Sequence, residues 1–263
     1  MEKLTGNYDD FEGLNQSFAL KLLNNTKGIK YPKKKKSDDD EDEGYDAFFI
    51  GKAFHFYVLQ CVYDSEFLNV YEPTDMRFGT NKFEEFKDAC KFMGKDVIKQ
   101  KDWDSFKIMK YEMNLNKYFK TIMENISETE VELKRYLLEH DIWIKGRLDI
   151  LTNTSHRCCD VKTIKPNVLG NATKLRYHII EYGYHLQALF YNYLLGIDDV
   201  KDMKYLLFFV EKEAPYNMQT VQLSVELLYD AEYLFKEAVK RYKQYKANGI
   251  ELTEGYDLPS LII

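Results

Sequence analysis

The sequence predicts an α/β (α+β) fold in which a central mixed β-sheet is flanked by helices. Two apolar segments, 144–151 and 158–162, are separated by turn-forming residues at 152–156, a pattern typical of two antiparallel strands. Apolar residues recur at three- and four-residue steps over 46–63 and 225–247, which is the period of an amphipathic helix. The chain has 263 residues and can therefore bury a sizeable core.

Helices predominate in the N-terminal part of the chain, up to about residue 126. The expected helices are 14–23, 46–63, 82–93 and 103–126. The first of them has a polar cap at Asn15 or Ser17. Residues 64–81 contain Pro73 and Gly79 among several turn formers, and we expect a loop there.

Strands predominate in the core that follows, from about residue 127 to 263. The expected strands are 127–137, 144–151, 158–162, 204–210 and 218–223. Pro166 cannot continue a ladder of hydrogen bonds, so 163–182 is expected to be a connection. A helix follows over 183–195, and the last helix covers 225–247.

The net charge of −6 argues mildly against a general DNA-binding protein. Six consecutive acids, Asp38 to Glu43, account for all of it, so the rest of the chain is neutral overall. These acids follow four lysines from Lys33, and we expect a flexible charged loop at 33–44 that is either solvated or touches DNA. No apolar run is long enough to cross a membrane, and the four cysteines lack metal-site spacing. We therefore expect a cytoplasmic protein with reduced thiols.

The two central strands carry the residues that point to chemistry. Side chains two apart on a strand share a face, so Asp160 and Lys162 emerge side by side while Val161 faces the core. Asp149, on the partner strand, can place its carboxylate opposite them. Two carboxylates attract a hard divalent cation such as magnesium, and a neighbouring lysine can position a water or offset phosphate charge. A hairpin with exposed charged residues would give the same short pattern.

Further motifs at matching positions support the first interpretation. Gly146-Arg147-Leu148-Asp149, followed by Asp160-Val161-Lys162, resembles the core of the PD-(D/E)XK nuclease superfamily. The segment with Gln187 and Tyr191, four apart on one helix face, resembles the Gln-x-x-x-Tyr helix of the RecB and lambda-exonuclease branch. Gly51-x-x-x-His55 resembles the histidine element of that branch. Order and spacing are similar to those of the RecE-type phage exonuclease domain from about residue 12 to 247.

The resemblance implies a restriction-endonuclease-like core, one nuclease domain over residues 1–263, and a role for each motif residue. The implied metal ligands are His55, Asp149, Asp160 and the backbone carbonyl of Val161, and the implied ion is Mg²⁺, for which Mn²⁺ can substitute. The implied catalytic residues are Lys162, Asp149, Asp160, Gln187 and Tyr191, with Gln187 and Tyr191 orienting Lys162 or the DNA end. Contacts with nucleic acid are expected from Arg147, Lys165, Lys174 and Arg176. Glu130 or Glu132 is a further candidate carboxylate, although a solvent-facing glutamate is the simpler interpretation.

The resemblance also implies a reaction and partners. The expected activity is hydrolysis of linear double-stranded DNA from the 5′ end by a phage or prophage enzyme in a bacterial host. The expected partners are a single-strand annealing protein and further copies of the chain in a ring, and the expected role is recombination by annealing. The residues leave open an endonuclease, a repair nuclease of other polarity, an enzyme that acts on RNA and a catalytically inactive DNA-binding module.

Overall fold

A six-stranded mixed sheet forms the centre of the structure, a computed structural model that describes residues 2–24 and 47–248. The strand order is β1-β4-β5-β6-β7-β8, with β6 and β7 parallel and every other neighbouring pair antiparallel. The strands are β1 (Glu2–Lys3), β4 (Ile126–Leu137), β5 (Ile142–Thr152), β6 (Cys158–Ile164), β7 (Tyr205–Glu211) and β8 (Met218–Gln222). The predicted fold class is therefore confirmed.

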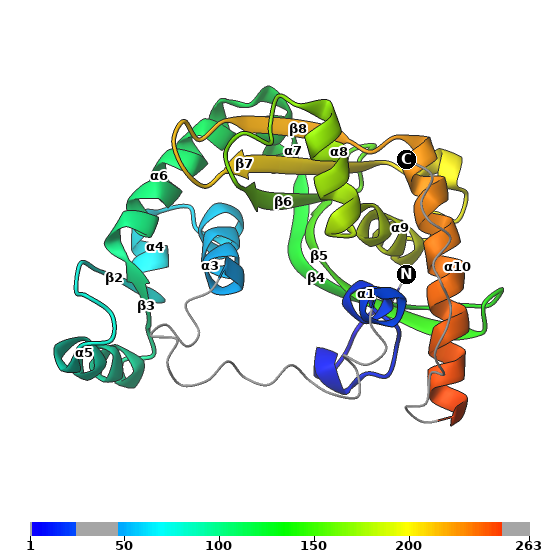
Figure 1. Cartoon of the computed structure of the whole chain (residues 1–263), viewed down its shortest axis with the longest axis horizontal. Coiled ribbons are helices and arrows are strands. Elements are labelled where there is room, and N and C mark those ends of the chain that lie inside the picture. The colour runs from blue at the N-terminus through cyan, green and yellow to red at the C-terminus, as the bar shows by residue number, and fades with distance from the viewer. Residues whose placement is uncertain (1, 25–46, 249–263) are drawn as a thin grey trace.

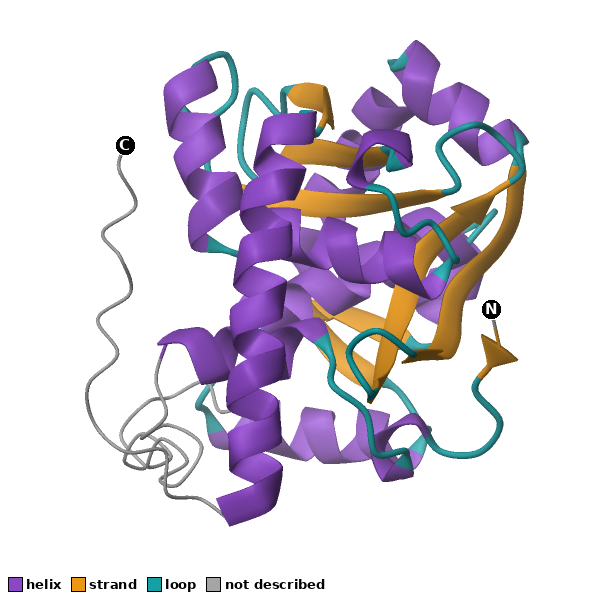
Figure 2. Cartoon of the chain, turned by 90° about the vertical axis from the view of Figure 1, so that its right-hand side faces the viewer, coloured by secondary structure: helices purple, strands orange, loops and turns teal. Residues whose placement is uncertain are grey.

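Helices cover both faces of this sheet (Figures 1 and 2). The helices are α1 (Gln16–Asn24), α3 (Ala47–Gln60), α4 (Asp64–Leu68), α5 (Asn81–Phe92), α6 (Gln100–Leu115), α7 (Lys117–Glu124), α8 (Ala172–Glu181), α9 (Tyr184–Leu194) and α10 (Val225–Asn248). Short 3₁₀ turns lie at Tyr8–Asp10 and Val200–Asp202. A second, two-stranded parallel sheet of β2 (Tyr71–Thr74) and β3 (Asp96–Lys99) lies beside α4 and α5.

The central strand β7 shows how the sheet divides two hydrophobic cores. Tyr205, Leu207 and Phe209 point into the core formed with α1, α9 and α10. The alternate residues, such as Phe208, point into the core formed with α3, α6 and α7. A strand that is buried on both faces reads as an unbroken apolar run, and all seven residues of β7 are buried. Side chains on β7 are thus assigned to one core or the other by their parity.

Local capping explains the position of the first helix. The side chain of Asn15 accepts a hydrogen bond from the backbone N–H of Phe18 at 2.8 Å, so the helix begins at Gln16. Of the two predicted caps, Asn15 therefore has this role. The helix packs on α10, which brings the N-terminal segment against the C-terminal part of the chain.

The loop predicted at 64–81 is wrong in part, because α4 and β2 lie there. Glu66 at the third position of α4 accepts hydrogen bonds from the N–H groups of Val62 and Tyr63, which stabilises this short helix. Pro73 is tolerated in β2 because the strand is an edge of a two-stranded sheet. Turn-forming residues therefore mark the ends of these short elements and not one continuous loop.

Two further predicted elements are also corrected. The helix expected over 103–126 is two helices, because Asn116 leaves the helical conformation and its side chain caps α7 through the N–H of Phe119. The connection expected over 163–182 contains α8, which begins where Asn171 accepts a hydrogen bond from the N–H of Lys174. Each correction involves an asparagine cap, a signal that is easily read as a turn.

Some sequence predictions fall outside the described residues. The charged run from Lys33 to Glu43, with its predicted loop at 33–44, belongs to the part of the chain that the structure does not describe. Among residues 2–24 and 47–248, no helix has the length and apolar character that a membrane span requires.

Candidate active site

The two strands that carry the predicted acidic residues separate at the site. Strands β5 and β6 pair at two positions, and the last of these joins Ile150 to Cys159. Beyond this point β5 follows β4, whereas β6 runs parallel to β7 (Figure 1). Asp149 and Asp160 are the next residue on each strand, so both carboxylates lie where the strands diverge. Both residues are buried, and Asp160 is fully so.

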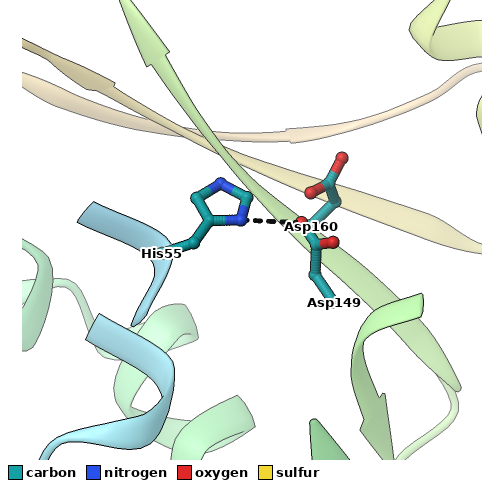
Figure 3. Close-up of side chains that lie close together, drawn as sticks. All are labelled: His55, Asp149 and Asp160. Atoms are coloured by element: carbon teal, nitrogen blue, oxygen red, sulfur yellow. Dashed lines mark ion pairs between the residues drawn. The ribbon is translucent and has the colours of Figure 1, made fainter. Parts of the chain in front are cut away.

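His55, on α3, reaches the same point from the helical layer (Figure 3). Its Nδ1 lies 3.4 Å from Oδ2 of Asp149, and its Nε2 lies 2.5 Å from the carbonyl oxygen of Val161. One potential ligand atom from each of His55, Asp149 and Asp160 lies within 4.8 Å of the other two. The structure thus brings together all the residues that the sequence suggested as metal ligands.

Lys162 completes this group of polar side chains. Its Nζ lies 2.5 Å from Oδ2 of Asp160, on the same face of β6, while Val161 between them points into the opposite core. Burial alone would lower the pKa of Lys162, but the nearby carboxylates of Asp160 and Asp149 raise it above the ordinary value. Lys162 is therefore an ammonium group at neutral pH.

The two carboxyl groups differ in their affinity for a proton. Burial raises the pKa of Asp149 well above its ordinary value, and the negative charge of Asp160 raises it further. Burial also opposes ionisation of Asp160, but the Lys162 ammonium outweighs it, and the pKa of Asp160 lies below its ordinary value. Asp160 is the ionised member of the pair, and Asp149 is the member that holds its proton to higher pH.

Gln187 and Tyr191, on α9, hold the strand that carries Asp149. The Gln187 amide donates to the hydroxyl of Tyr191 at 3.0 Å, and that hydroxyl donates to the backbone carbonyl of Arg147 at 2.6 Å. The close approach of α9 to β5 requires a glycine at position 146, because a Cβ there would lie 2.7 Å from Leu194 and 3.2 Å from Tyr191. These hydrogen bonds connect α9 to β5, two residues from Asp149, and not to Lys162.

A family model described as a PDDEXK-like domain of unknown function (DUF3799) matches residues 20–253. The chain belongs to this family. The matched range includes every residue of the site described above, and the superfamily predicted from the motifs is confirmed. The site is thus the candidate active site of a PDDEXK-like domain, at the place where β5 and β6 diverge.

Solved structures align with this PDDEXK-like domain over most of its length. A protein from Eubacterium rectale, whose name gives exonuclease as its provisional activity, aligns with a TM-score of 0.57 at 9% identity, covering 97% of this chain and 96% of that one. A phage-related exonuclease from Haemophilus somnus 129PT aligns with a TM-score of 0.39 at 13% identity, covering 91% and 98% of the two chains. No curated protein sequence matches this chain.

The donor atoms of this PDDEXK-like site suit a divalent cation. Nε2 of His55 contacts a carbonyl, which can only accept, so this nitrogen carries the proton of the neutral imidazole. Burial lowers the pKa of His55, and the positive charge of Lys162 lowers it further, which keeps the ring neutral. Nδ1 then directs a lone pair at Oδ2 of Asp149, a buried atom without a hydrogen-bond partner among the described residues. A proton or a cation has to lie between two such acceptors.

The Val161 carbonyl has a different contact from the one suggested by the sequence. It accepts the hydrogen bond from Nε2 of His55 and therefore fixes the orientation of the imidazole. A carbonyl that orients a histidine supports a metal site indirectly. Direct coordination by Val161 would replace this hydrogen bond and stays a prediction.

The cations suggested for nucleic-acid binding lie in different environments. Arg147 is exposed but bound to Glu132, with Nη2 2.5 Å from the carboxylate. Lys165, Lys174 and Arg176 are exposed on the segment that leaves β6 and on α8. These three have side chains available to solvent, whereas Arg147 would have to exchange Glu132 for a phosphate.

Glu130 is a residue whose position could not be read from the sequence. It lies opposite Asp149 in β4 and adopts φ of +51°, a left-handed conformation, while the register with β5 is the same on both sides of it. Burial raises the pKa of the Glu130 carboxyl, which lies within electrostatic reach of Arg147, Asp160 and Lys162. The sequence offered Glu130 or Glu132 as a further carboxylate, and the structure places Glu130 toward the site and Glu132 with Arg147. Only a left-handed backbone conformation, which leaves no sequence signal at a glutamate, distinguishes them.

Proposed function

We propose that the chain is a magnesium-dependent exodeoxyribonuclease that hydrolyses linear double-stranded DNA from the 5′ end. The observation that carries the proposal is the convergence of His55, Asp149 and Asp160 on one buried point, with Lys162 beside them. If Asp149 and Asp160 had only a structural role, their buried carboxylate oxygens without hydrogen-bond partners would reduce stability with no compensating interaction. The PDDEXK-like nuclease fold supports the reaction class, and the resemblance to RecE-type exonucleases supports the substrate and polarity.

The cation would be held by the side chains of His55, Asp149 and Asp160, with the Val161 carbonyl as a further ligand. Mg²⁺ fits the carboxylate-rich set, and Mn²⁺ fits a set that includes a histidine nitrogen. A cation held there would supply positive charge that polarises the scissile phosphate and makes a water more acidic. Asp149 must lose its proton before it can ligate, so cation binding releases a proton into solution.

Lys162 acts as an electrostatic residue in this proposal. Its raised pKa keeps it protonated, so it donates hydrogen bonds and does not remove a proton from water. Its three N–H groups can orient the attacking water and stabilise negative charge that develops on the phosphate oxygens. Asp160 holds the ammonium in place at 2.5 Å, and the buried position of both groups strengthens the interaction.

Gln187 and Tyr191 position the site through the backbone. Their hydrogen bonds hold the Arg147 carbonyl and thus the part of β5 that presents Asp149. For the reaction as a whole we expect a 3′ single strand as the product, a single-strand annealing protein as its recipient and a ring of copies around the DNA. These expectations rest on the resemblance to RecE-type exonucleases and extend the proposal.

The test is degradation of linear duplex DNA labelled separately at the 5′ and 3′ ends, with magnesium or with chelator. We expect magnesium-dependent loss from the 5′ end, reduced at least about 100-fold in Asp160→Asn and Lys162→Met. The matched control is Lys201→Met, an exposed lysine on the 3₁₀ turn Val200–Asp202. Its activity should equal that of the wild type.

Other outcomes would replace the proposal by a specific alternative. Equal cutting of closed circular DNA would indicate an endonuclease, and loss from the 3′ end would indicate a nuclease of other polarity. DNA binding without cleavage under all metal conditions would indicate an inactive DNA-binding module and would overturn the mechanism.

A further inference from the structure

An aromatic cluster begins at the candidate catalytic lysine and ends at the molecular surface. Nζ of Lys162 lies 5.2 Å from the ring centre of Tyr184, which is the first residue of α9. The Tyr184 ring is stacked with that of Tyr182, at 5.9 Å between centres and 24° between planes. His178 contacts both rings, at 4.4 Å from Tyr182 and 5.8 Å from Tyr184. None of these aromatic residues has a role in the hydrogen bonds that support Asp149.

Gly183 holds the two tyrosines parallel. It has φ of +67° between α8 and α9, a left-handed conformation that turns the chain sharply. A Cβ at this position would lie 2.7 Å from the side chain of Leu20, so α1 closes the far side of the turn. The residues before and after Gly183 lie close together, with their rings stacked. The stacked pair is a consequence of this backbone turn and does not require a flexible loop.

The cluster passes from buried to exposed over a short distance. Tyr184 is partly buried against Phe209 and next to Lys162, whereas Tyr182 is 52% exposed. His178 contributes a buried Nε2 that has no hydrogen-bond partner among the described residues. Tyrosines that serve only to fill a core are buried on both faces, and Tyr182 is not. Its exposed ring stacks on Tyr184, which in turn contacts Lys162.

We propose that Tyr182 is a stacking platform for an unpaired nucleobase at the end of the DNA strand that enters the active site. The proposal rests on the proposed nuclease function, because it concerns a nucleotide close to the scissile phosphate. Stacking accepts every base, since each has an aromatic face, and thus suits an enzyme that must digest any sequence. In this arrangement the scissile phosphate lies near Lys162 and Tyr184, and the unpaired base stacks on Tyr182. Pre-stacked Tyr184 and His178 keep the Tyr182 ring from rotating away, which reduces the entropy lost on binding.

Helix α8 supplies a matched control. Tyr177 is 47% exposed on this helix, close to the exposure of Tyr182, and no aromatic contact joins it to the cluster. A general effect of removing a surface tyrosine would appear equally in both variants. A stacking role would appear at Tyr182 alone, and Tyr182→Phe would keep it because phenylalanine retains the ring face.

The experiment measures DNA binding without cleavage, with calcium in place of magnesium. The probes are a duplex with a short unpaired 5′ end and a blunt duplex, each with 5-iodouracil in its terminal nucleotides for photochemical cross-linking to stacked rings. We expect Tyr182→Ala to bind the unpaired end about 5-fold or more weakly than the wild type. The blunt duplex should be affected less, and cross-linked peptides of the wild type should contain Tyr182. Tyr182→Phe and Tyr177→Ala should bind both probes as the wild type does.

Each failure has its own signature. If the wild type degrades DNA, but Tyr182→Ala binds the unpaired end normally and no cross-link forms at Tyr182, the platform is refuted while the nuclease function stands. If no DNA is degraded but the cross-link and the binding loss are present, the nuclease function fails and the base-binding site stands. A loss of melting temperature in Tyr182→Ala together with equal weakening for both probes would mean a structural role and would also refute the platform.

Discussion

At the scale of single residues, the proton on Asp149 links stability, pH and metal binding. The pKa of Asp149 in the folded protein is raised by burial and by Asp160, whereas the unfolded chain has an ordinary aspartate. Between the unfolded and the folded pKa, the unfolded chain has released this proton and the folded chain still binds it. Stability therefore falls as pH rises through that window and is higher below it. A cation that replaces the proton would restore the lost stability.

We predict that Asp149→Asn stabilises the metal-free protein at neutral pH. The amide is neutral at every pH, so the cost of a buried, raised-pKa carboxyl disappears. The melting temperature in chelator should rise by a few degrees at pH 7.5, since about 1 kcal/mol corresponds to about 2–4 °C for a chain of this size. The difference from wild type should vanish as the pH falls toward 4.

The second part of the Asp149→Asn test is the melting temperature after addition of Mg²⁺ or Mn²⁺. The ion should raise the melting temperature of the wild type and leave that of Asp149→Asn unchanged. Asp230→Asn, at an exposed position of α10, should behave as the wild type in both conditions. A lower melting temperature of Asp149→Asn at all pH values would contradict the assignment of the buried proton.

We also predict a contribution of Glu130 to cation binding. The Glu130 carboxylate lies within electrostatic reach of both aspartates, so it adds negative charge around the ligands. Glu130→Gln should weaken Mn²⁺ binding about 10- to 100-fold in calorimetric titrations without DNA. Glu132→Gln, two residues along the same strand, removes the partner of Arg147 and should change the affinity far less. Equal affinities of wild type and Glu130→Gln would show that Glu130 has no part in metal binding.

At the scale of elements, the position of α9 against β5 decides whether Asp149 is presented correctly. Helix α9 contacts β5 at Gly146, which has no side chain and therefore leaves room for Leu194 and Tyr191. The hydroxyl of Tyr191 can therefore reach the Arg147 carbonyl. In a close-packed interior this contact cannot move independently of the strand, so packing of the helix and geometry of the site are coupled.

We predict opposite effects for alanine at two glycines. Gly146→Ala should destabilise the fold by about 1–3 kcal/mol, because the new methyl group overlaps packed side chains. Gly51→Ala on α3 has open space around the new Cβ and should stabilise the fold by about 0.5–1 kcal/mol through helix propensity. Chemical denaturation of both variants measures these changes. A stable Gly146→Ala variant would show that α9 and β5 can separate without cost.

The sequence predicted those elements whose periodicity is long and regular, and those site residues whose spacing is local. The strand period placed Asp160 beside Lys162, and the helix period placed Gln187 beside Tyr191. Short elements such as β2 and β3 were not predicted, because four residues are too few to show a hydrophobic period. The divergence of β5 from β6 was not predicted either, since the sequence suggests a hairpin but does not indicate how many residues of its strands are paired. The target of the Tyr191 hydroxyl is set by tertiary packing alone.

At the scale of the whole molecule, charge is distributed unevenly. The chain has a net charge of −6, yet Lys165, Lys174 and Arg176 are exposed on one connected segment, from the end of β6 to α8. In the proposed function the chain would therefore rely on local cations and a bound metal to attract DNA, because its net negative charge repels the phosphate backbone. Its affinity for DNA should therefore depend on few contacts and strongly on salt.

We predict that Lys174→Ala and Arg176→Ala weaken DNA binding uniformly across sequences. Each variant should reduce the slope of log affinity against log salt concentration by about 1, because one phosphate contact and its released counterion are lost. Lys201→Ala, which is exposed on a 3₁₀ turn, should keep the wild-type slope. Fluorescence anisotropy over a salt series measures all three. Unchanged slopes in the α8 variants would place the DNA path elsewhere on the molecule.

The turn between β5 and β6 has a further consequence for this architecture. Thr152 and Thr154 tie it closed, since the Thr152 hydroxyl donates to the carbonyl of His156 at 2.9 Å and the Thr154 hydroxyl accepts from the His156 N–H at 3.2 Å. Two paired positions and this turn set the register of β6 against β5, and seven paired positions hold β6 against β7. A shift of β6 by one residue would exchange the two faces of the strand and send Asp160 into the apolar core. The length of this turn is therefore part of the chemistry of the site.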